Sequence, residues 1–404
     1  MELADVDLFD PDTYAEAVPH EQFALLRAEA PVFLQELPDG RRFYNVTRHQ
    51  DLVAVNRDNA SYSSWKATAL IAPQMDDMIE QQRMMMLNMD PPDHTKLRKI
   101  VNKGFTPRMI RALMDHLADE AASIVGRARG LGTFDFVTEV AAELPLIAIA
   151  EFLGVPVEDR KIIFDLSNRL IGFEDPEFNT SAEDGAAASA AMFMYAQELA
   201  ARKRVEPGDD IATTLLRAEV DGESLTDMDF NLFFLLLSVA GNETTRNAIS
   251  HGMLAMLEHP DQWQLLRDDP SLLDGAVEEI LRWASPVMQF RRTATRDTEI
   301  RGVPIAEGDR VVFWHISANR DEAVFDRPYD FDITRSPNAH TTSHIAFGGG
   351  GPHFCLGANL ARAEIKVIFE ALLAGTPTLE PAGPVRRLRS NFINGIKEMQ
   401  LTVA

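Results

Sequence analysis

The hydrophobic positions of this chain follow two periods, one helical and one typical of strands. Residues 31–37 and 41–48 flank Pro38-Asp39-Gly40, a tight-turn signal, and predict an early β-hairpin. Helical patterns fill most of the following half, and a later stretch around 298–300 and 310–315 predicts strands separated by a turn. We therefore expect a mainly α protein with a smaller β-rich part.

The longest helical pattern begins at a capping signal, Thr226 to Asp229, and continues to His259-Pro260, which is about 33 residues. From Phe230 to Val239 it is hydrophobic on nearly every side, which predicts a helix through the centre of the protein. Its middle carries Ala240-Gly241-Asn242-Glu243-Thr244-Thr245. Glycine weakens a helix and a buried glutamate needs a partner, so this polar interruption indicates a functional site.

Composition narrows the class of protein. The 404 residues are 46% hydrophobic and 25% charged, which is ordinary for a globular chain with a sizeable core. The formal net charge of −23 argues against nucleic acid or anionic membrane as main partners. The start of the chain is acidic, and no apolar run approaches the ~20 residues of a bilayer span, so we expect a cytoplasmic protein without a membrane anchor. No linker or repeat interrupts the pattern, and residues 1–404 are expected to form one domain.

The only cysteine, Cys355, lies in a loop with four consecutive glycines, Phe347 to Gly357. A single cysteine excludes an intramolecular disulfide and fits a reducing compartment. The loop leads into a helix predicted over Ala358–Leu373. The positive end of that helix is expected to favour the thiolate and to lower the pKa of Cys355.

These residues by themselves leave four roles open for Cys355. It could be a nucleophile with His353 as base, or a bystander in a phosphate loop that lacks the usual Lys-Ser or Lys-Thr. It could be the axial ligand of a flat cofactor, which the glycines would allow to approach closely. It could also be a buried structural cysteine.

Three motifs together resemble those of the cytochrome P450 monooxygenases. They are the segment Ala240 to Thr245, the pair Glu279 and Arg282, and the cysteine loop Phe347 to Gly357. The likeness extends from the Phe9-Asp10-Pro11 region to the C-terminus. It implies the P450 fold, with the long helix over a heme b whose iron is bound by Cys355. It also implies insertion of one atom of dioxygen into a C–H bond of a hydrophobic substrate.

The resemblance assigns roles to further residues. His94 and Arg98, four apart on one helix face, would bind a heme propionate. Thr244 would bond its hydroxyl to the carbonyl of Ala240, and Glu243 with Thr244 would relay protons during oxygen activation. The full set of implied cofactor contacts is His94, Arg98, Ala240, Gly241, Arg292, Phe347, His353 and Gly357, with Gly241 leaving space for dioxygen.

Two positions depart from the family pattern. Phe347 stands eight positions before Cys355, one more than is commonest in the family. Asp330, and not the arginine that is often found there, precedes Phe331. The third partner of Glu279 and Arg282 is then Arg327 or Arg335, and the sequence leaves both open.

Electrons must come from another protein, because one cysteine cannot hold an iron–sulfur cluster. The resemblance implies a ferredoxin and its reductase. Basic residues that would steer an acidic partner are concentrated at Lys96, Arg98, Lys99, Lys103, Arg108, Arg111, Arg362 and Lys366. A solvated basic helix face is the alternative.

The segments that line the substrate cavity in the family are apolar in this chain, namely 64–87, 171–173, 235–240, 287–290 and 391–396. They supply the candidate pocket residues Met86, Leu87, Val239, Val287, Phe290, Phe392 and Ile393.

Stretches such as Met86–Asp90, Lys103–Arg108 and Asn394–Lys397 resemble the bacterial steroid carbon-26 monooxygenases. This branch implies terminal side-chain hydroxylation of a sterol or steroid such as cholest-4-en-3-one. The alternatives are a hydroxylase of terpenoids, alkyl chains or fatty acids, and a non-catalytic heme or sterol sensor.

Overall fold

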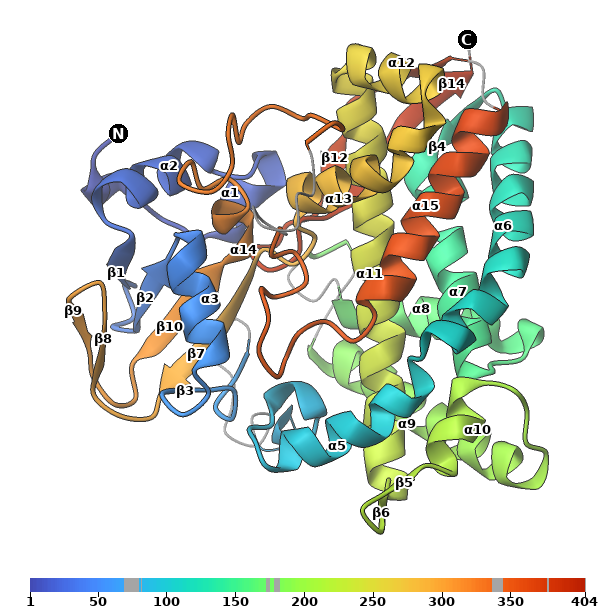
Figure 1. Ribbon diagram of the computed structural model, residues 1–404, viewed down its shortest axis with the longest axis horizontal. Coiled ribbons are helices and arrows are strands. Elements are labelled where there is room, and N and C mark those ends of the chain that lie inside the picture. Colours follow the sequence, from blue (N-terminus) through green and yellow to red (C-terminus); the bar gives the residue numbers. More distant parts are fainter. Residues whose placement is uncertain are drawn as a thin grey trace.

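Helices make up most of the computed structural model, which describes residues 1–68, 80, 82–171, 175–177, 182–335, 344–375 and 378–403 (Figure 1). The expected mainly α class is confirmed. The helices are α1 (Pro11–Glu16), α2 (His20–Glu29), α3 (His49–Arg57), α5 (Asp93–Val101), α6 (Pro107–Gly130), α7 (Glu143–Leu153), α8 (Arg160–Ile171), α9 (Ala182–Val205), α10 (Ile211–Leu216), α11 (Asp227–Glu258), α12 (Pro260–Asp268), α13 (Leu273–Ala284), α14 (His315–Ala318) and α15 (Ala358–Gly375).

The strands form one larger sheet and several small ones. The larger sheet has the order β1 (Val32–Glu36), β2 (Arg42–Val46), β10 (Arg310–Trp314), β7 (Gln289–Ala294) and β3 (Tyr62–Ser63). A second sheet joins β11 (Leu379–Pro381), β14 (Gln400–Val403) and β4 (Thr133–Asp135). Three hairpin-like pairs remain: β5 (Glu219–Val220) with β6 (Glu223–Ser224), β8 (Thr298–Ile300) with β9 (Val303–Ile305), and β12 (Arg386–Arg387) with β13 (Ile396–Glu398).

The early hairpin is confirmed, because β1 and β2 pair antiparallel around the Pro38-Asp39-Gly40 turn. The later strands are more complex than expected. β8 pairs with the additional strand β9, whereas β10 joins the larger sheet between β2 and β7. His315, which was expected to end a strand, begins α14.

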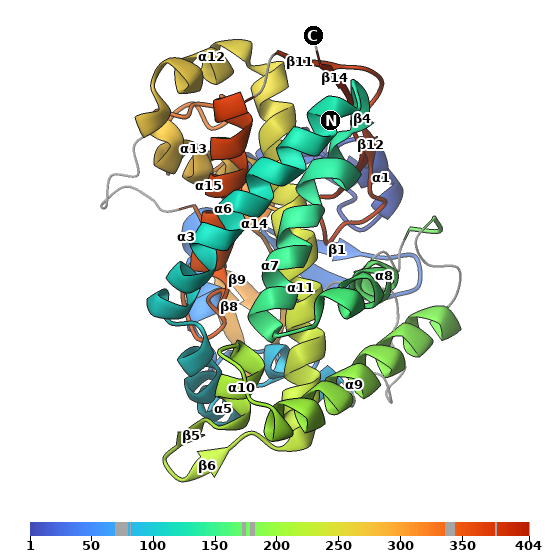
Figure 2. The same ribbon diagram turned by 90° about the vertical axis from the view of Figure 1, so that its right-hand side faces the viewer.

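Helix α11 runs through the middle of the helical part, as expected (Figures 1 and 2). Its start is fixed by a capping box, in which Thr226 Oγ1 accepts from Asp229 N–H at 3.1 Å and Asp229 Oδ2 accepts from Thr226 N–H at 3.0 Å. Helices α7, α8, α9, α13 and α15 all pack against it. In the described part of the chain, neither α11 nor any other helix is both long and apolar enough to cross a bilayer.

A tightly packed core holds α11 to α13 and α15. A Cβ on Gly252 of α11 would lie 2.9 Å from both Ile280 of α13 and Phe369 of α15, so the three helices meet at this glycine. Ile249, Ile280 and Phe369 are fully buried, and burial of each such side chain stabilises the fold by ~1.5–3 kcal/mol. Figure 1 shows the loop before α15 lying between this bundle and α3 on the sheet side.

Candidate functional site

The glycine-rich loop before α15 is held by the end of α3. Gly348, Gly349, Gly350 and Gly351 have φ angles of 99°, 66°, 104° and 80°, a region that favours glycine. A Cβ at Gly351 would lie 2.4 Å from the backbone oxygen of Asn56, and Asn56 Nδ2 donates to the carbonyl of Gly348. The loop therefore has a defined shape that side chains would disrupt.

Cys355 ends this loop, three residues before α15, and its side chain is half-buried. Its N–H donates to the carbonyl of Phe347 at 3.0 Å. Burial raises the pKa of the Cys355 thiol, although the Gly357 N–H and the charges of Arg98 and Arg362 act to lower it. The expectation of a lowered pKa is wrong, because loss of solvent outweighs the helix terminus and the two arginines.

Four nitrogen-bearing side chains from three parts of the chain gather at the cysteine loop. The rings of His94, on α5, and His353 have centroids 4.2 Å apart. Arg98, one turn after His94, donates to the carbonyl of Phe354 at 2.7 Å. Arg292, on β7, donates to Asn56 Oδ1 at 3.2 Å, so it reaches the same side chain that holds the loop. The structure thus brings together four residues that the sequence placed in one set.

This cluster lacks the anions that it would need. Arg292 is 3% exposed and forms no salt bridge with a carboxylate of the described residues. Burial lowers the pKa of Arg292 to about 10, and lowers the pKa values of His94 to about 4 and of His353 to about 2. His94 Nδ1 is buried without a partner. The nearby carboxylate of Asp90 already accepts from Ser63 Oγ and from Ser64 N–H. The cluster is therefore suited to bind an acidic group of a ligand.

The His353 ring is occupied away from the thiol. Its Nε2 lies 3.2 Å from Ser64 Oγ, its ring lies beside that of His94, and it also has a backbone hydrogen bond with Met89. No hydrogen bond joins it to Cys355 in the described part of the chain, so this geometry does not favour a cysteine nucleophile with His353 as base.

One face of α11 is left open at its middle. Ala240 is exposed and Thr244, one turn later, is partly exposed, although the residues before and after them are mostly buried. Thr244 Oγ1 donates to the carbonyl of Ala240 at 2.8 Å, as expected. A Cβ on Gly241 would meet Ile149 Cδ1 at 2.7 Å, so this glycine allows α7 to pack closely against α11.

Glu243 is buried on the neighbouring face of α11, at 2% exposed. Its Oε1 accepts from Arg246 and, at 2.9 Å, from Asn247 Nδ2. The carboxylate is therefore held by two side chains of its own helix and has no hydrogen bond to Thr244 in the described structure. The sequence analysis missed Asn247, although its spacing of four from Glu243 was a usable signal.

The pair of Glu279 and Arg282 is closed by Arg335. Arg282 Nε and Nη2 each donate to Glu279 at 2.7 Å, and Arg335 Nε lies 3.2 Å from Glu279 Oε2. Arg327 instead pairs with Asp330 at 3.0 Å. The choice between the two arginines that the sequence left open is thus made by packing.

The ring of Phe347 is fixed by neighbours on α15 and the loop. The Arg362 guanidinium lies 4.6 Å from the ring centroid, and the His344 ring lies 5.7 Å away. Arg362 and His344 both bind Glu278, whose pKa is lowered to about 2 against the effect of its burial. The Phe347 ring therefore has defined contacts with Arg362 and His344, despite the extra glycine in the loop.

The candidate pocket residues fall into two places. The backbones of Val287 and Ile393 form a β-bridge, and the Phe290 and Phe392 rings lie 5.7 Å apart, so these four residues lie on two neighbouring segments. Leu87 and Val239 are half-buried. Of the predicted segments, 69–79, 81 and 172–174 lie outside the described residues.

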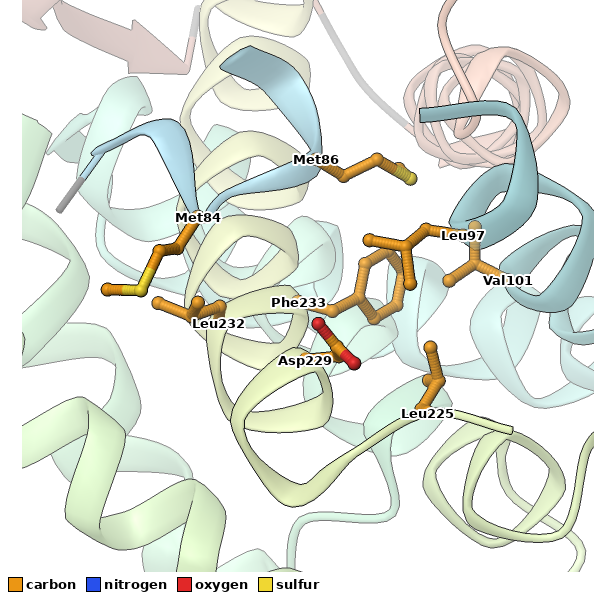
Figure 3. A pocket seen from close by; sticks show the side chains of 8 residues that line it. All are labelled: Met84, Met86, Leu97, Val101, Leu225, Asp229, Leu232 and Phe233. Atoms are coloured by element: carbon orange, nitrogen blue, oxygen red, sulfur yellow. The ribbon is translucent and has the colours of Figure 1, made fainter. Parts of the chain in front are cut away.

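Met86 lines a separate small pocket at the start of α11 (Figure 3). Its other lining residues are Met84, Leu97, Val101, Leu225, Asp229, Leu232 and Phe233. The pocket is apolar except for the carboxylate of Asp229, which also closes the capping box of α11. Met86 is thus not shown in contact with the four residues around Phe392.

The sequence analysis also missed Asn56, which joins the loop to Arg292. It lies 292 residues before Gly348, at the end of α3, and no motif marks it. Only the folded chain brings it to the site.

Comparison with known proteins gives consistent matches. The family model for cytochrome P450 matches residues 185–375. A steroid C26-monooxygenase of Rhodococcus jostii is 47% identical over 98% of this chain and 84% of its own, and a methyl-branched lipid omega-hydroxylase of Mycobacterium bovis is 40% identical over 99% and 95%. The structure of Mycobacterium marinum cytochrome P450 CYP268A2 in complex with pseudoionone matches with a TM-score of 0.90, 38% identity and 98% coverage of both chains.

Proposed function

This chain belongs to the cytochrome P450 family and is a monooxygenase, and from that premise we propose that it hydroxylates the terminal side-chain carbon of a sterol or steroid. The observation that carries the substrate class is the 47% identity, along nearly the whole chain, to a steroid C26-monooxygenase. The reaction consumes one C–H bond, dioxygen, two electrons and two protons, and yields an alcohol and water.

The described residues fit a heme b. The fit rests on Arg292 and His94, a buried cation without a carboxylate partner and a buried ring nitrogen without any partner, which suit the two propionates of this cofactor. Arg98 and His353 complete that set. The raised pKa of Cys355 fits a metal ligand too, since a bound cation supplies the charge that a buried thiolate needs. When bound, heme iron supplies the activation of dioxygen.

Residues of α11 would manage the protons. Thr244 faces the open side of the helix with its hydroxyl on the Ala240 carbonyl, so it can hold water or dioxygen there. Glu243, buried one position earlier, is the titratable group nearest in sequence to that opening and would supply protons to it. Glu279, Arg282 and Arg335 keep the cysteine-side scaffold in place.

Coupling of electron use to product tests the proton roles. Glu243→Gln and Thr244→Ala should each lower product formed per reducing equivalent by roughly tenfold and release the balance as peroxide, because proton delivery of this kind contributes ~10²–10⁴-fold to rates. The control is Ser238→Ala, which removes a buried hydroxyl that bonds only the Phe234 carbonyl. Normal coupling in both variants would show that this pair does not deliver protons.

An optical titration of the ferric holoprotein tests the substrate. We expect cholest-4-en-3-one at micromolar concentration to shift the Soret band to the high-spin form, because a bound steroid excludes water from the open face of α11. Pseudoionone and a methyl-branched fatty acid serve as competitors, because one relative is known in complex with pseudoionone and another is named a methyl-branched lipid omega-hydroxylase. A shift with these and none with cholestenone, in protein whose reduced carbonyl complex shows thiolate ligation, would replace the steroid by a terpenoid or a lipid.

We propose that the protein works in the cytoplasm and receives electrons from a ferredoxin. The basic side chains of α5 face acidic ones of the β5–β6 pair: Lys96 Nζ lies 3.6 Å from Glu223, and Lys99 Nζ lies 3.5 Å from Asp221. All four are largely exposed, so these pairs are weak and an acidic partner can compete for the lysines.

A further inference from the structure

A buried polar connection joins Glu243 to the C-terminal segment of the chain. Asn247 stands one turn after Glu243 on α11 and has no exposed surface. Its Nδ2 donates to Glu243 Oε1 at 2.9 Å, and its Oδ1 accepts from the Ile396 N–H at 3.0 Å. A backbone N–H can only donate, so Ile396 takes the oxygen end of the amide and leaves its NH₂ end for the carboxylate.

The segment that reaches Asn247 also carries two of the predicted pocket residues, Phe392 and Ile393. Ile393 bridges Val287, and Phe392 packs its ring on Phe290 at 5.7 Å. Only two residues, Asn394 and Gly395, separate Ile393 from Ile396. A ligand that displaces Phe392 and Ile393 therefore acts on backbone close to Ile396, whose N–H is bonded to the Asn247 side chain.

The same segment is anchored between two helices. Asn394 N–H donates to the Pro286 carbonyl at 2.9 Å, and Asn394 Nδ2 donates to the Ala284 carbonyl at 2.6 Å at the end of α13. On the other side, His251 Nε2 lies 3.1 Å from the Asn394 carbonyl. These bonds make Asn394 a fixed point between Phe392 and Ile393 on one side and the Ile396 N–H on the other.

Two groups hold the Glu243 carboxylate, and they differ in kind. Arg246 supplies the charge, and a buried ion pair is costly to break because each partner is left without compensation. Asn247 supplies a neutral hydrogen bond from an amide that Ile396 orients. Of these two groups, it is the Asn247 amide that is bonded to the segment that follows Phe392 and Ile393.

We propose that Asn247 is a positioning residue that couples occupancy of the substrate pocket to the position of Glu243. With the pocket empty, the amide bonded to Ile396 keeps Glu243 beside Arg246 and away from the open face of α11. Substrate against Phe392 and Ile393 turns the segment, the amide releases Glu243, and protons are delivered only when a C–H bond is present to be oxidised. This rests on the proposed role of Glu243 in proton delivery.

The first test is a double-variant cycle on the holoenzyme with a ferredoxin, its reductase and whichever of cholest-4-en-3-one and pseudoionone gives the larger spin shift. Asn247→Ala should lower product per reducing equivalent by roughly three- to tenfold, as the loss of one buried hydrogen bond allows. The ligand concentration for half the spin shift should fall as well, by up to about the same factor, because the ligand no longer has to break the bond between Asn247 and Ile396. In a Glu243→Gln background the same change should have no further effect. The matched control is Ser250→Ala, since Ser250 is equally buried on α11 and bonds only the Arg246 carbonyl.

The second test does not need turnover. Hydrogen exchange of the peptide that contains Ile396 should speed up when the ligand binds, because its N–H loses the Asn247 acceptor. In Asn247→Ala the exchange should be fast with and without ligand, and in Ser250→Ala it should follow the unchanged protein.

The outcomes separate the two proposals. Normal coupling in Glu243→Gln would overturn the proton role of Glu243. Uncoupling in Glu243→Gln with normal coupling in Asn247→Ala, or losses that multiply in the double variant, would overturn the role of Asn247 alone. An Ile396 peptide whose exchange is unchanged by ligand would likewise overturn it, whereas a purely structural Asn247 would lower thermal stability and leave coupling intact.

Discussion

Glu364 lies on α15, nine residues after Cys355, with 2% of its surface exposed. Its Oε2 has no hydrogen-bond partner in the described structure, and burial raises its pKa well above the usual range of a glutamate. Buried Glu279, by contrast, is bound by Arg282 and Arg335. The two buried glutamates thus differ in role: Glu364 is a neutral acid, whereas Glu279 is part of an ion pair.

We predict that Glu364→Gln stabilises the protein at neutral pH. The folded state keeps the proton of Glu364, whereas the unfolded chain releases it above about pH 4.3, so the stability of the natural protein falls as pH rises through the window between the two pKa values. Glutamine removes this dependence, so the gain in stability should be present at pH 7 and vanish near pH 4.

Denaturant unfolding of the holoprotein across this pH range measures the effect. The exposed Glu370 of the same helix provides the control, since Glu370→Gln should change stability by less than about 0.5 kcal/mol. A gain that is the same at pH 4 and pH 7 would contradict the assignment of a neutral Glu364.

At the scale of elements, the loop before α15 depends on contact with α3. We predict that Gly351→Ala disrupts it, because a Cβ would lie 2.4 Å from the Asn56 oxygen and φ is +80°. The expected cost exceeds the ~1–2 kcal/mol of the backbone angle alone. The reduced carbonyl complex should also lose its thiolate absorption, since the displaced loop carries Cys355.

A glycine in the β1–β2 turn isolates the effect of the backbone angle. Gly40 has φ +82°, and its Cβ would meet nothing within 4 Å, so Gly40→Ala should cost only that angle and leave the carbonyl spectrum unchanged. Equal losses of stability in Gly351→Ala and Gly40→Ala would show that the contact between the loop and α3 contributes nothing to the stability of the fold.

For the molecule as a whole, charge is distributed unevenly. The chain carries a formal net charge of −23, yet α5 presents Lys96 and Lys99, and the β5–β6 pair places Glu223 and Asp221 against them. An acidic electron donor must compete with these two carboxylates for the lysines.

Removal of both acids should speed electron transfer. We predict that Asp221→Asn with Glu223→Gln raises the rate of reduction by a bacterial ferredoxin several-fold at low salt, and that the difference disappears above about 0.5 M salt, where the screening length is only a few ångströms. Glu36→Gln with Glu380→Gln removes the same charge from exposed positions elsewhere. If this pair gives an equal increase, net charge and not the β5–β6 pair limits the rate.

The sequence by itself determined what depends on residues close together in the chain. The capping box at Thr226, the bond from Thr244 to Ala240 and the pair of Glu279 and Arg282 all join residues three or four apart, and helical geometry alone brings such residues together. The early hairpin follows from a local turn in the same way. The glycine loop with its cysteine, taken together with the segment Ala240 to Thr245 and the pair of Glu279 and Arg282, indicated the family, because each motif is a short stretch of the linear chain.

Only the tertiary structure decided what depends on distant segments and on burial. It selected Arg335 over Arg327 for Glu279, and it brought Asn56 to the loop across 292 residues. It raised the pKa of Cys355, where a local argument from the helix terminus had the opposite sign. Periodicity specifies which face of a helix or strand is apolar. Loss of solvent and long-range contacts arise only when those faces pack together. The desolvation of Cys355 and the hydrogen bond between Ile396 and Asn247 therefore could not be predicted from the spacing of residues in the sequence.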